Sequence, residues 1–137
     1  MDKVLILAVC LLGLLQSSAE AAPPQYGGRL RWDAGSLQTR KALRVRFQFE
    51  QINDIWYAIN LGASLRLKFK LKGAAIKHGR KKLRRVVNGS NCLVLYDVTF
   101  KPASNWSFVR TALAYGFECD NGSEGWEGFA GRLPRLP

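Results

Sequence analysis

The segment from Leu65 to Lys72 reads L-R-L-K-F-K-L-K, in which apolar and cationic side chains alternate without exception. Only an extended strand has this two-residue period, because successive side chains of a strand point to opposite faces. One face is therefore expected in a core, and the other carries a row of cations about 7 Å apart along the chain. The rest of the sequence has to supply partner strands for the apolar face and a role for the basic face.

Other segments also have strand patterns. Leu43 to Phe49 alternates in the same way, and Ile55 to Leu61 is apolar and aromatic, which favours a bent antiparallel pair. Cys92 to Phe100 is dense in β-branched and aromatic residues, and Val109 to Cys119 alternates again. These patterns predict a small α+β domain, mainly β, with a four-stranded antiparallel sheet. An all-β meander without a helix is the alternative.

Two segments leave a helix open. Ser36 can cap a short helix that runs to Lys41, although no sustained helical spacing follows it. A helix that runs into the segment from Leu43 is a second alternative, because apolar residues there also fit one helical face: Val45, Phe49, Ile52 and Trp56.

Residues 1–21 have the pattern of a secretory signal peptide, with Lys3, an apolar run and an A-x-A site that ends at Ala21. The apolar run is well short of the roughly 20 residues that span a membrane, so we expect a secreted, extracellular protein without a transmembrane segment in the mature chain. We expect a lead-in over residues 22–42, a disulfide-linked sheet domain over 43–119 and a flexible tail over 120–137.

The cysteines indicate one disulfide. Cys10 would leave with the signal peptide, and Cys92 and Cys119 would remain in a chain bound for an oxidising compartment. These two thiols and His78, the only histidine, cannot fill a four-coordinate structural metal site, so we expect no metal.

The segment from Gly73 to Arg85 is predicted to be a basic loop. The chain holds 21 Lys and Arg against 10 Asp and Glu, a net charge of +11, and many of the cations gather in and before this loop. A block of like charge is often only a solvated connector. Because this one follows a cationic strand, the two fields should add, which predicts one anion-binding surface. Its residues are Lys68, Lys70, Lys72, Lys77, Arg80, Lys81, Lys82, Arg84 and Arg85.

Three N-x-S triplets lie in predicted loops and are candidate glycosylation sites, at Asn88, Asn105 and Asn121. The Gly/Pro-rich segment from Asp120 to Pro137 keeps large apolar groups next to cations. On a flexible tail such groups tuck back onto the domain or dock on another protein. The candidate receptor-binding residues of the tail are Trp126, Phe129, Arg132 and Arg135.

The strand C-L-V-L-Y-D-V-T-F, the strand that closes on Cys119 and the preceding L-R-L-K-F-K-L resemble the second half of the cystatin superfamily. Within it, the basic segment R-K-K-L-R-R-V-V-N-G and the tail G-F-A-G-R-L-P-R are most similar to chemerin and the cathelicidin pro-domains. The resemblance covers about Leu43 to Arg135 and implies a cystatin-like sheet and a signalling tail. The Q-x-V-x-G loop of protease-inhibiting cystatins is missing, which disfavours inhibition.

Catalysis is disfavoured, because His78 stands alone and the chain has no carboxylate pair, phosphate-binding glycine loop or nucleophile elbow. We therefore expect no enzyme and no cofactor. The main hypothesis is a secreted basic ligand that resembles chemerin and attracts cells through a cell-surface receptor. The alternative is a cationic host-defence protein that binds glycosaminoglycans or other anionic polysaccharide or lipid surfaces. No nucleic-acid partner is expected for a secreted chain.

Overall fold

The computed structural model describes residues 23–61 and 66–137, and within these ranges the chain forms strands and no helix. The strands are β1 (Gln25–Gly35), β2 (Ala42–Ile52), β3 (Ile55–Asn60), β4 (Leu67–Lys70), β5 (Lys77–Val87), β6 (Ser90–Pro102), β7 (Phe108–Cys119) and β8 (Glu124–Pro134). The expected α+β, cystatin-like fold with a four-stranded sheet is therefore wrong. The chain forms a single eight-stranded antiparallel sheet.

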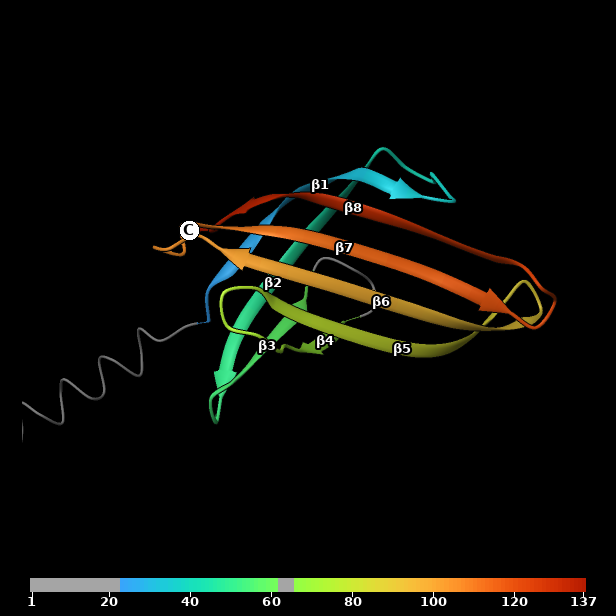
Figure 1. Ribbon diagram of the computed structural model, residues 1–137, viewed down its shortest axis with the longest axis horizontal. Helices are drawn as coiled ribbons and strands as arrows, with labels where there is room; N and C mark the ends of the chain where they lie inside the picture. Colours follow the sequence, from blue (N-terminus) through green and yellow to red (C-terminus); the bar gives the residue numbers. More distant parts are fainter. Residues whose placement is uncertain (1–22, 62–65) are drawn as a thin grey trace, which may run out of the picture.

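The strand order is β4-β3-β2-β1-β8-β7-β6-β5. Strands β1 to β4 form one meander and β5 to β8 another, and the pairing of β1 with β8 joins them. Figure 1 shows β5 to β8 as long strands side by side, with β2 crossing their direction steeply. The sheet curls until its edges meet, where the backbone N–H groups of Lys72 and His78 each donate to the other residue's carbonyl at 2.9 and 2.8 Å. The result is a nearly closed, barrel-like sheet.

Two of the hairpins turn on residue pairs with positive φ. Asn53 and Asp54 connect β2 to β3 with φ of 51° and 65°, and Asn88 and Gly89 connect β5 to β6 with φ of 50° and 81°. Such pairs match the right-handed twist of the strands that they join, and Asn, Asp and Gly adopt them most readily. The predicted turn at Asn88 is thus confirmed.

Three segments expected outside the sheet are strands. The lead-in contains β1, the basic loop is largely β5, and the tail contains β8, which is hydrogen-bonded on both sides by β1 and β7. Two of the glycines of β8 are packing positions: a Cβ at Gly125 would come within 2.6 Å of Leu37, and one at Gly131 within 2.9 Å of the Arg29 carbonyl oxygen. The composition of this segment therefore reflects close approach between neighbours rather than flexibility.

Neither helical alternative forms. Residues 36–41 make a bent connection between β1 and β2, in which Leu37 donates its N–H to the carbonyl of Trp126 at 3.0 Å. The second segment divides between β2 and β3, so that Val45 and Phe49 lie on a buried strand face. Pairing of β2 with both β1 and β3 satisfies the backbone groups that a helix would have satisfied internally.

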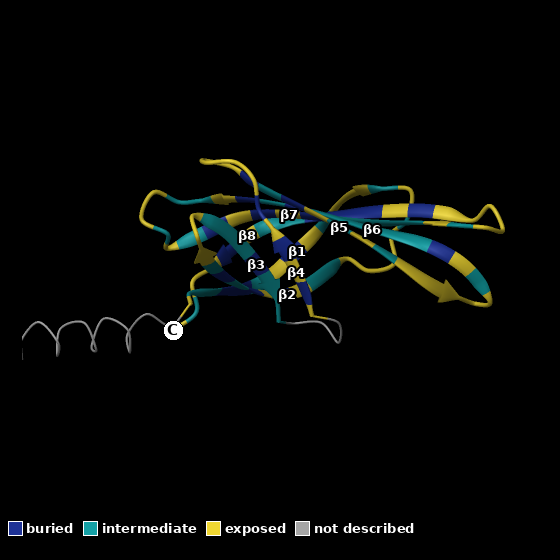
Figure 2. Cartoon of the chain, turned by 90° about the horizontal axis from the view of Figure 1, so that it is seen from below, coloured by how far each residue is buried: buried dark blue, intermediate teal, exposed yellow. Residues whose placement is uncertain are grey.

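Figure 2 shows buried residues, in dark blue, on the strands of the closed part of the sheet. The core that these residues form is rich in aromatic rings. The ring of Phe49 lies 4.8 Å from that of Phe100 and 5.9 Å from that of Trp106, both edge-on. The Tyr26 hydroxyl donates to the Trp106 carbonyl at 2.6 Å, which fixes the connection between β6 and β7 onto this end of the core. Edge-to-face rings add about 0.5 to 1.5 kcal/mol per pair beyond their area burial.

The predicted signal peptide and the start of the Leu65 strand lie outside the described residues. Within the described ranges, no helix is long and apolar enough to cross a membrane.

Candidate functional site

The cations of β4 and β5 are sorted by the strand period. On β4 and directly after it, Leu67, Phe69 and Leu71 are buried in the core, so the lysines between them face outward. On β5, Gly79 is buried, and a Cβ there would lie 2.9 Å from that of Phe69. The inner faces of β4 and β5 therefore meet at this seam, and their outer faces form one convex surface.

We call this convex surface the outer basic face. Its cations are all exposed to solvent and lie at alternate positions along β4 and β5, with one more, Lys72, just after β4: Lys68, Lys70, Lys72, Arg80, Lys82 and Arg84. Residues two apart on a strand are about 7 Å apart, so each row presents a regular series of charges.

Carboxylates pair with two of the six cations of this face. Glu50 bonds Lys68 at 3.2 Å, and Asp97 on β6 bonds both Arg80, at 3.1 Å, and His78, at 2.5 Å. The Arg80 side chain stays 72% exposed, so its contact with Asp97 is screened by solvent and leaves the guanidinium accessible.

Three cations of the expected surface lie elsewhere. Lys77 is only 6% exposed, donates to the Ala74 carbonyl at 2.8 Å and lies 5.2 Å from the Trp56 ring centre. Lys81 and Arg85 fall on the inner face of β5, the face of the partly buried Leu83. The basic segment is therefore divided between two faces of a strand, where the sequence had suggested one loop surface.

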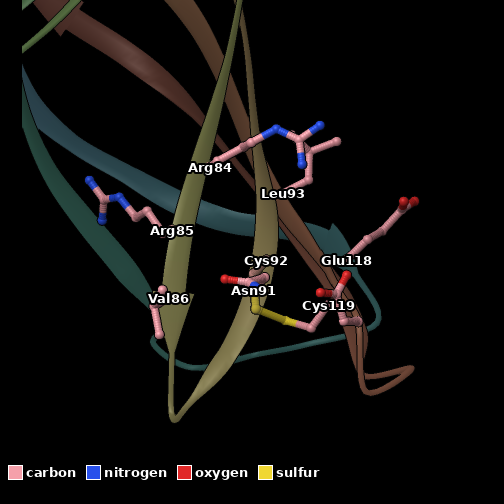
Figure 3. A pocket seen from close by; sticks show the side chains of 9 residues that line it. Arg84, Arg85, Val86, Asn91, Cys92, Leu93, Glu118 and Cys119 are labelled. Atoms are coloured by element: carbon pink, nitrogen blue, oxygen red, sulfur yellow. A yellow bond between two sulfur atoms is a disulfide. The ribbon is translucent and has the colours of Figure 1, made fainter.

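A hollow of about 540 Å³ lies at the end of the sheet where β5 and β7 end and β6 begins (Figure 3). Figure 3 shows Arg84 and Arg85 leaving β5 on opposite sides, with Glu118 on the neighbouring hairpin. Its lining mixes cations with Glu118 and Asp120 and wraps around both faces of the sheet end. This hollow has no convergent set of polar groups, and we assign it no ligand.

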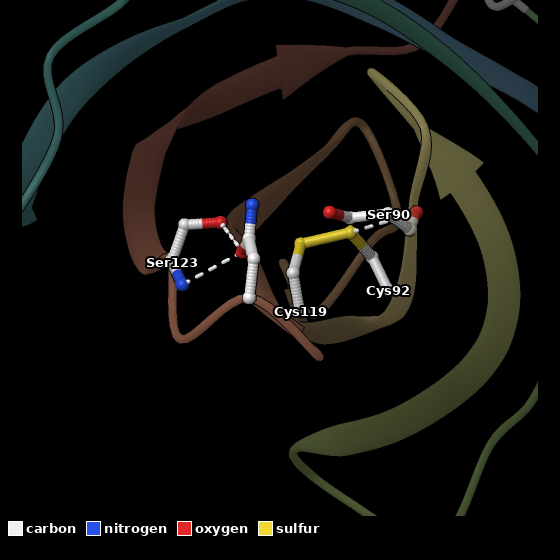
Figure 4. Close-up of a disulfide and its surroundings, with 5 residues drawn as sticks. Ser90, Cys92, Cys119 and Ser123 are labelled. Carbon is white, nitrogen blue, oxygen red and sulfur yellow. Dashed lines mark hydrogen bonds between the residues drawn. A yellow bond between two sulfur atoms is a disulfide. The ribbon is translucent and has the colours of Figure 1, made fainter.

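The predicted disulfide joins Cys92 and Cys119, which are direct partners in the register of β6 and β7 with Cα atoms 4.0 Å apart. Figure 4 shows the bridge beside Ser90, whose carbonyl lies 3.6 Å from the Cys92 sulfur, and Ser123 of the next turn. The bridge fastens the open end of the hairpin formed by β6 and β7. The strand next to this hairpin, β5, carries part of the outer basic face.

The predicted tail residues do not form one site. Phe129 is 1% exposed and packs in the core, whereas Trp126 on the opposite face of β8 is 48% exposed. Arg132 lies 3.6 Å over the centre of the Phe108 ring, and Arg135 extends the strand pairing, with its N–H on the Ser107 carbonyl at 3.0 Å.

The three N-x-S triplets lie at turns, with Asn88, Asn105 and Asn121 all exposed. The side-chain oxygens of Asn105 and Asn121 accept hydrogen bonds from Ser107 and Ser123 of their own triplets. Their occupancy stays a prediction.

A buried carboxylate was missed by the sequence analysis. Glu127 on β8 is 0% exposed and accepts hydrogen bonds from the backbone N–H and hydroxyl of Thr39 and from the Tyr115 hydroxyl. Burial acts to raise the pKa of Glu127, but these hydrogen bonds and the nearby Arg40 charge hold that pKa below its ordinary value. The pKa of Tyr115 is raised, mainly by burial and secondly by its hydrogen bond to Glu127. No sequence signal marks Glu127, because its partners come from distant parts of the chain.

Among the described residues, no group of His, Cys, Asp and Glu side chains is arranged to hold a metal ion. Comparison with known proteins finds no matching family model, no matching curated protein and no matching solved structure.

Proposed function

We propose that this protein binds a linear sulfated polysaccharide through the outer basic face. The observation that carries the proposal is the convergence of exposed cations from two strands onto one convex surface, at positions separated by about 7 Å along each strand. A chain of repeating sulfates can follow such rows and contact several cations at once.

The chemistry of this face favours a polysaccharide over a membrane. A membrane-binding surface places apolar side chains beside its cations so that they enter the lipid boundary. The outward positions of β4 and of residues 78–84 hold only Lys, Arg and His, and the exposed Val86 lies at the end of the row. The predicted signal peptide would deliver the chain to the extracellular space, where sulfated polysaccharides are found.

The hypothesis of a chemoattractant ligand stays a prediction, but the structure does not support the flexible tail on which it was based. That hypothesis needs a free C-terminal segment that docks into a receptor, whereas residues 124–134 are a strand paired on both sides. Phe129 could reach a receptor only if β8 left the sheet, which would expose the core.

The strand itself supplies a matched test. K82E/R84E reverses two charges on the outer basic face, and K81E/R85E makes the same charge change on the inner face of the same strand. On a heparin column, we expect K82E/R84E to elute at clearly lower salt than K81E/R85E, because only the outer row contacts the polymer. The binding should weaken steeply with salt, since exposed charges are screened over about 8 Å at physiological ionic strength.

Circular dichroism and thermal unfolding of both variants control for folding. Equal elution of the two variants would mean that net charge alone causes retention. Binding to vesicles of anionic phospholipid without retention on heparin would overturn the choice of a polysaccharide.

A further inference from the structure

A second hollow, of about 460 Å³, lies inside the curl of the sheet, and we call it the inner pocket. Its walls come from opposite sides of the strand order: β2, β3 and β4 on one side, and β6 and β7 on the other. The volume falls within the range of about 300 to 1,000 Å³ that is typical of small-molecule sites. The lining residues that define the walls are Leu43, Val45, Leu67, Phe69, Tyr96, Leu113 and Tyr115.

The deeper walls of the inner pocket are apolar. Val45, Phe69 and Leu113 are each at most 5% exposed and belong to the core, so they form a fixed surface rather than mobile side chains. The closure of β4 against β5 at Gly79 holds Phe69 in place. An apolar group that entered the pocket would therefore leave water without an accompanying collapse of the walls.

Tyr115 gives the pocket a rigid polar group. Its ring stacks on Phe129 with centres 6.2 Å apart, and its hydroxyl bonds Glu127, which is itself held by Thr39. The Tyr96 ring lies 6.3 Å from the Tyr115 ring on the neighbouring strand. Groups that are already held in position lose little entropy when a ligand binds.

The mouth of the pocket is cationic. Arg40 contributes to the lining and is exposed to solvent. Arg44 also borders the pocket, but it alternates with the inward-facing Leu43 and Val45, so its side chain faces the outer side of β2. The Arg40 charge lies close enough to act on both Glu127 and Tyr115. Glu127 is buried in the wall, and its oxygens are taken by donors from Thr39 and Tyr115. Thr39 and Tyr115 are neutral donors and leave the charge of the buried Glu127 in place, so the positive charge that the mouth presents to solvent is that of Arg40.

We propose that the inner pocket binds a small amphipathic carboxylate, with its apolar body between the two halves of the sheet and its carboxylate at Arg40. This site is separate from the outer basic face, because its side chains lie inside the curl. A cationic or uncharged amphiphile of the same length lacks the contact with Arg40 and binds more weakly.

The test uses the full-length chain and decanoate, with decyltrimethylammonium as a probe of the same chain length and opposite charge. Isothermal titration calorimetry below the micelle-forming concentration gives the affinity, and the NMR shift of ¹³C-carboxyl decanoate reports on the head group. We expect decanoate to bind at one site at least tenfold more tightly than decyltrimethylammonium.

Two variants locate the site. R40Q should weaken decanoate binding about tenfold, whereas R31Q, which removes the same charge from an exposed position on β1, should leave it unchanged. L43F, which enlarges a side chain of the wall, should weaken both probes. K82E/R84E should not change decanoate binding, so failure of this proposal is distinct from failure of the polysaccharide proposal.

Two outcomes would overturn the inner-pocket proposal. One is the same decanoate affinity in R40Q and R31Q, which would place the head group elsewhere. The other is no saturable binding of decanoate by a protein whose circular dichroism shows an intact fold.

Discussion

The phenol of Tyr115 on β7 donates a hydrogen bond to the carboxylate of Glu127, its direct partner in the register with β8. Thr39, from the connection between β1 and β2, donates to the same carboxylate through its N–H and its hydroxyl. A fully buried charge is thus satisfied by hydrogen-bond donors from two other parts of the chain. This contact fixes the β1–β2 connection onto the end of the sheet beside the inner pocket.

The Glu127 carboxylate should make stability depend on pH. Because its folded pKa lies below the ordinary value of 4.5, its contribution is complete above that value and is lost as pH falls through the folded pKa. E127Q should lower the free energy of unfolding by about 1 to 3 kcal/mol at pH 7 and by much less at acidic pH. Urea unfolding across this range measures the difference. The exposed E124Q should stay within about 0.5 kcal/mol of the wild type throughout, and a penalty for E127Q that does not change with pH would contradict the assignment.

The disulfide should stabilise the chain chiefly by restricting its unfolded state. Cys92 and Cys119 are 27 residues apart, and closure of such a loop corresponds to about 3 to 4 kcal/mol. Replacement of both by alanine should lower the free energy of unfolding in urea by that amount. Alkylation before and after reduction, read by intact mass, should show no free thiol at either position until reduction; two free thiols in the untreated protein would refute the bridge.

The two aromatic residues of β8 should behave differently. F129A should cost about 3 to 5 kcal/mol, since it empties a fully packed core position. W126A should cost less than about 1 kcal/mol, because Trp126 is half exposed on the other face of the strand. Thermal or urea unfolding of the two variants decides this, and equal, small effects would mean that β8 is not held in the sheet.

Closure of the sheet should depend on Gly79. G79A would bring a Cβ within 2.9 Å of the Phe69 Cβ and 3.0 Å of a Leu71 methyl group, so we expect a loss of about 1 to 3 kcal/mol and faster amide exchange in β4. G128A is the matched control on another strand, where the nearest atom would be 3.6 Å away. Unchanged exchange in β4 of G79A would show that the seam between β4 and β5 does not need close contact.

Some strands missing from the sequence analysis left a local signal. Asn88 and Gly89 form a turn typical of a two-residue hairpin, and the strand after it was recognised, so the segment before it had to be a strand as well. The pattern of that segment predicts a loop, because Leu83 is its main apolar residue on the inner face. Once β5 is a strand, alternation alone separates Arg80, Lys82 and Arg84 from Lys81 and Arg85.

The sequence by itself indicated strands at β2, β3, β4, β6 and β7 and the partnership of Cys92 with Cys119. Alternation and a high content of apolar, aromatic and β-branched residues are local properties, and the two cysteines outside the predicted signal peptide allow one pairing. Only the tertiary structure decided that the Gly-rich segment from Glu124 joins β1 to β7 and that the sheet closes at Gly79. The position of the Gly-rich segment depends on backbone hydrogen bonds between β1 and β8, which lie about a hundred residues apart in the sequence. Closure at Gly79 depends on the space that the absent side chain leaves for Phe69 and Leu71. Neither has a period in the sequence, and both the outer basic face and the inner pocket depend on them.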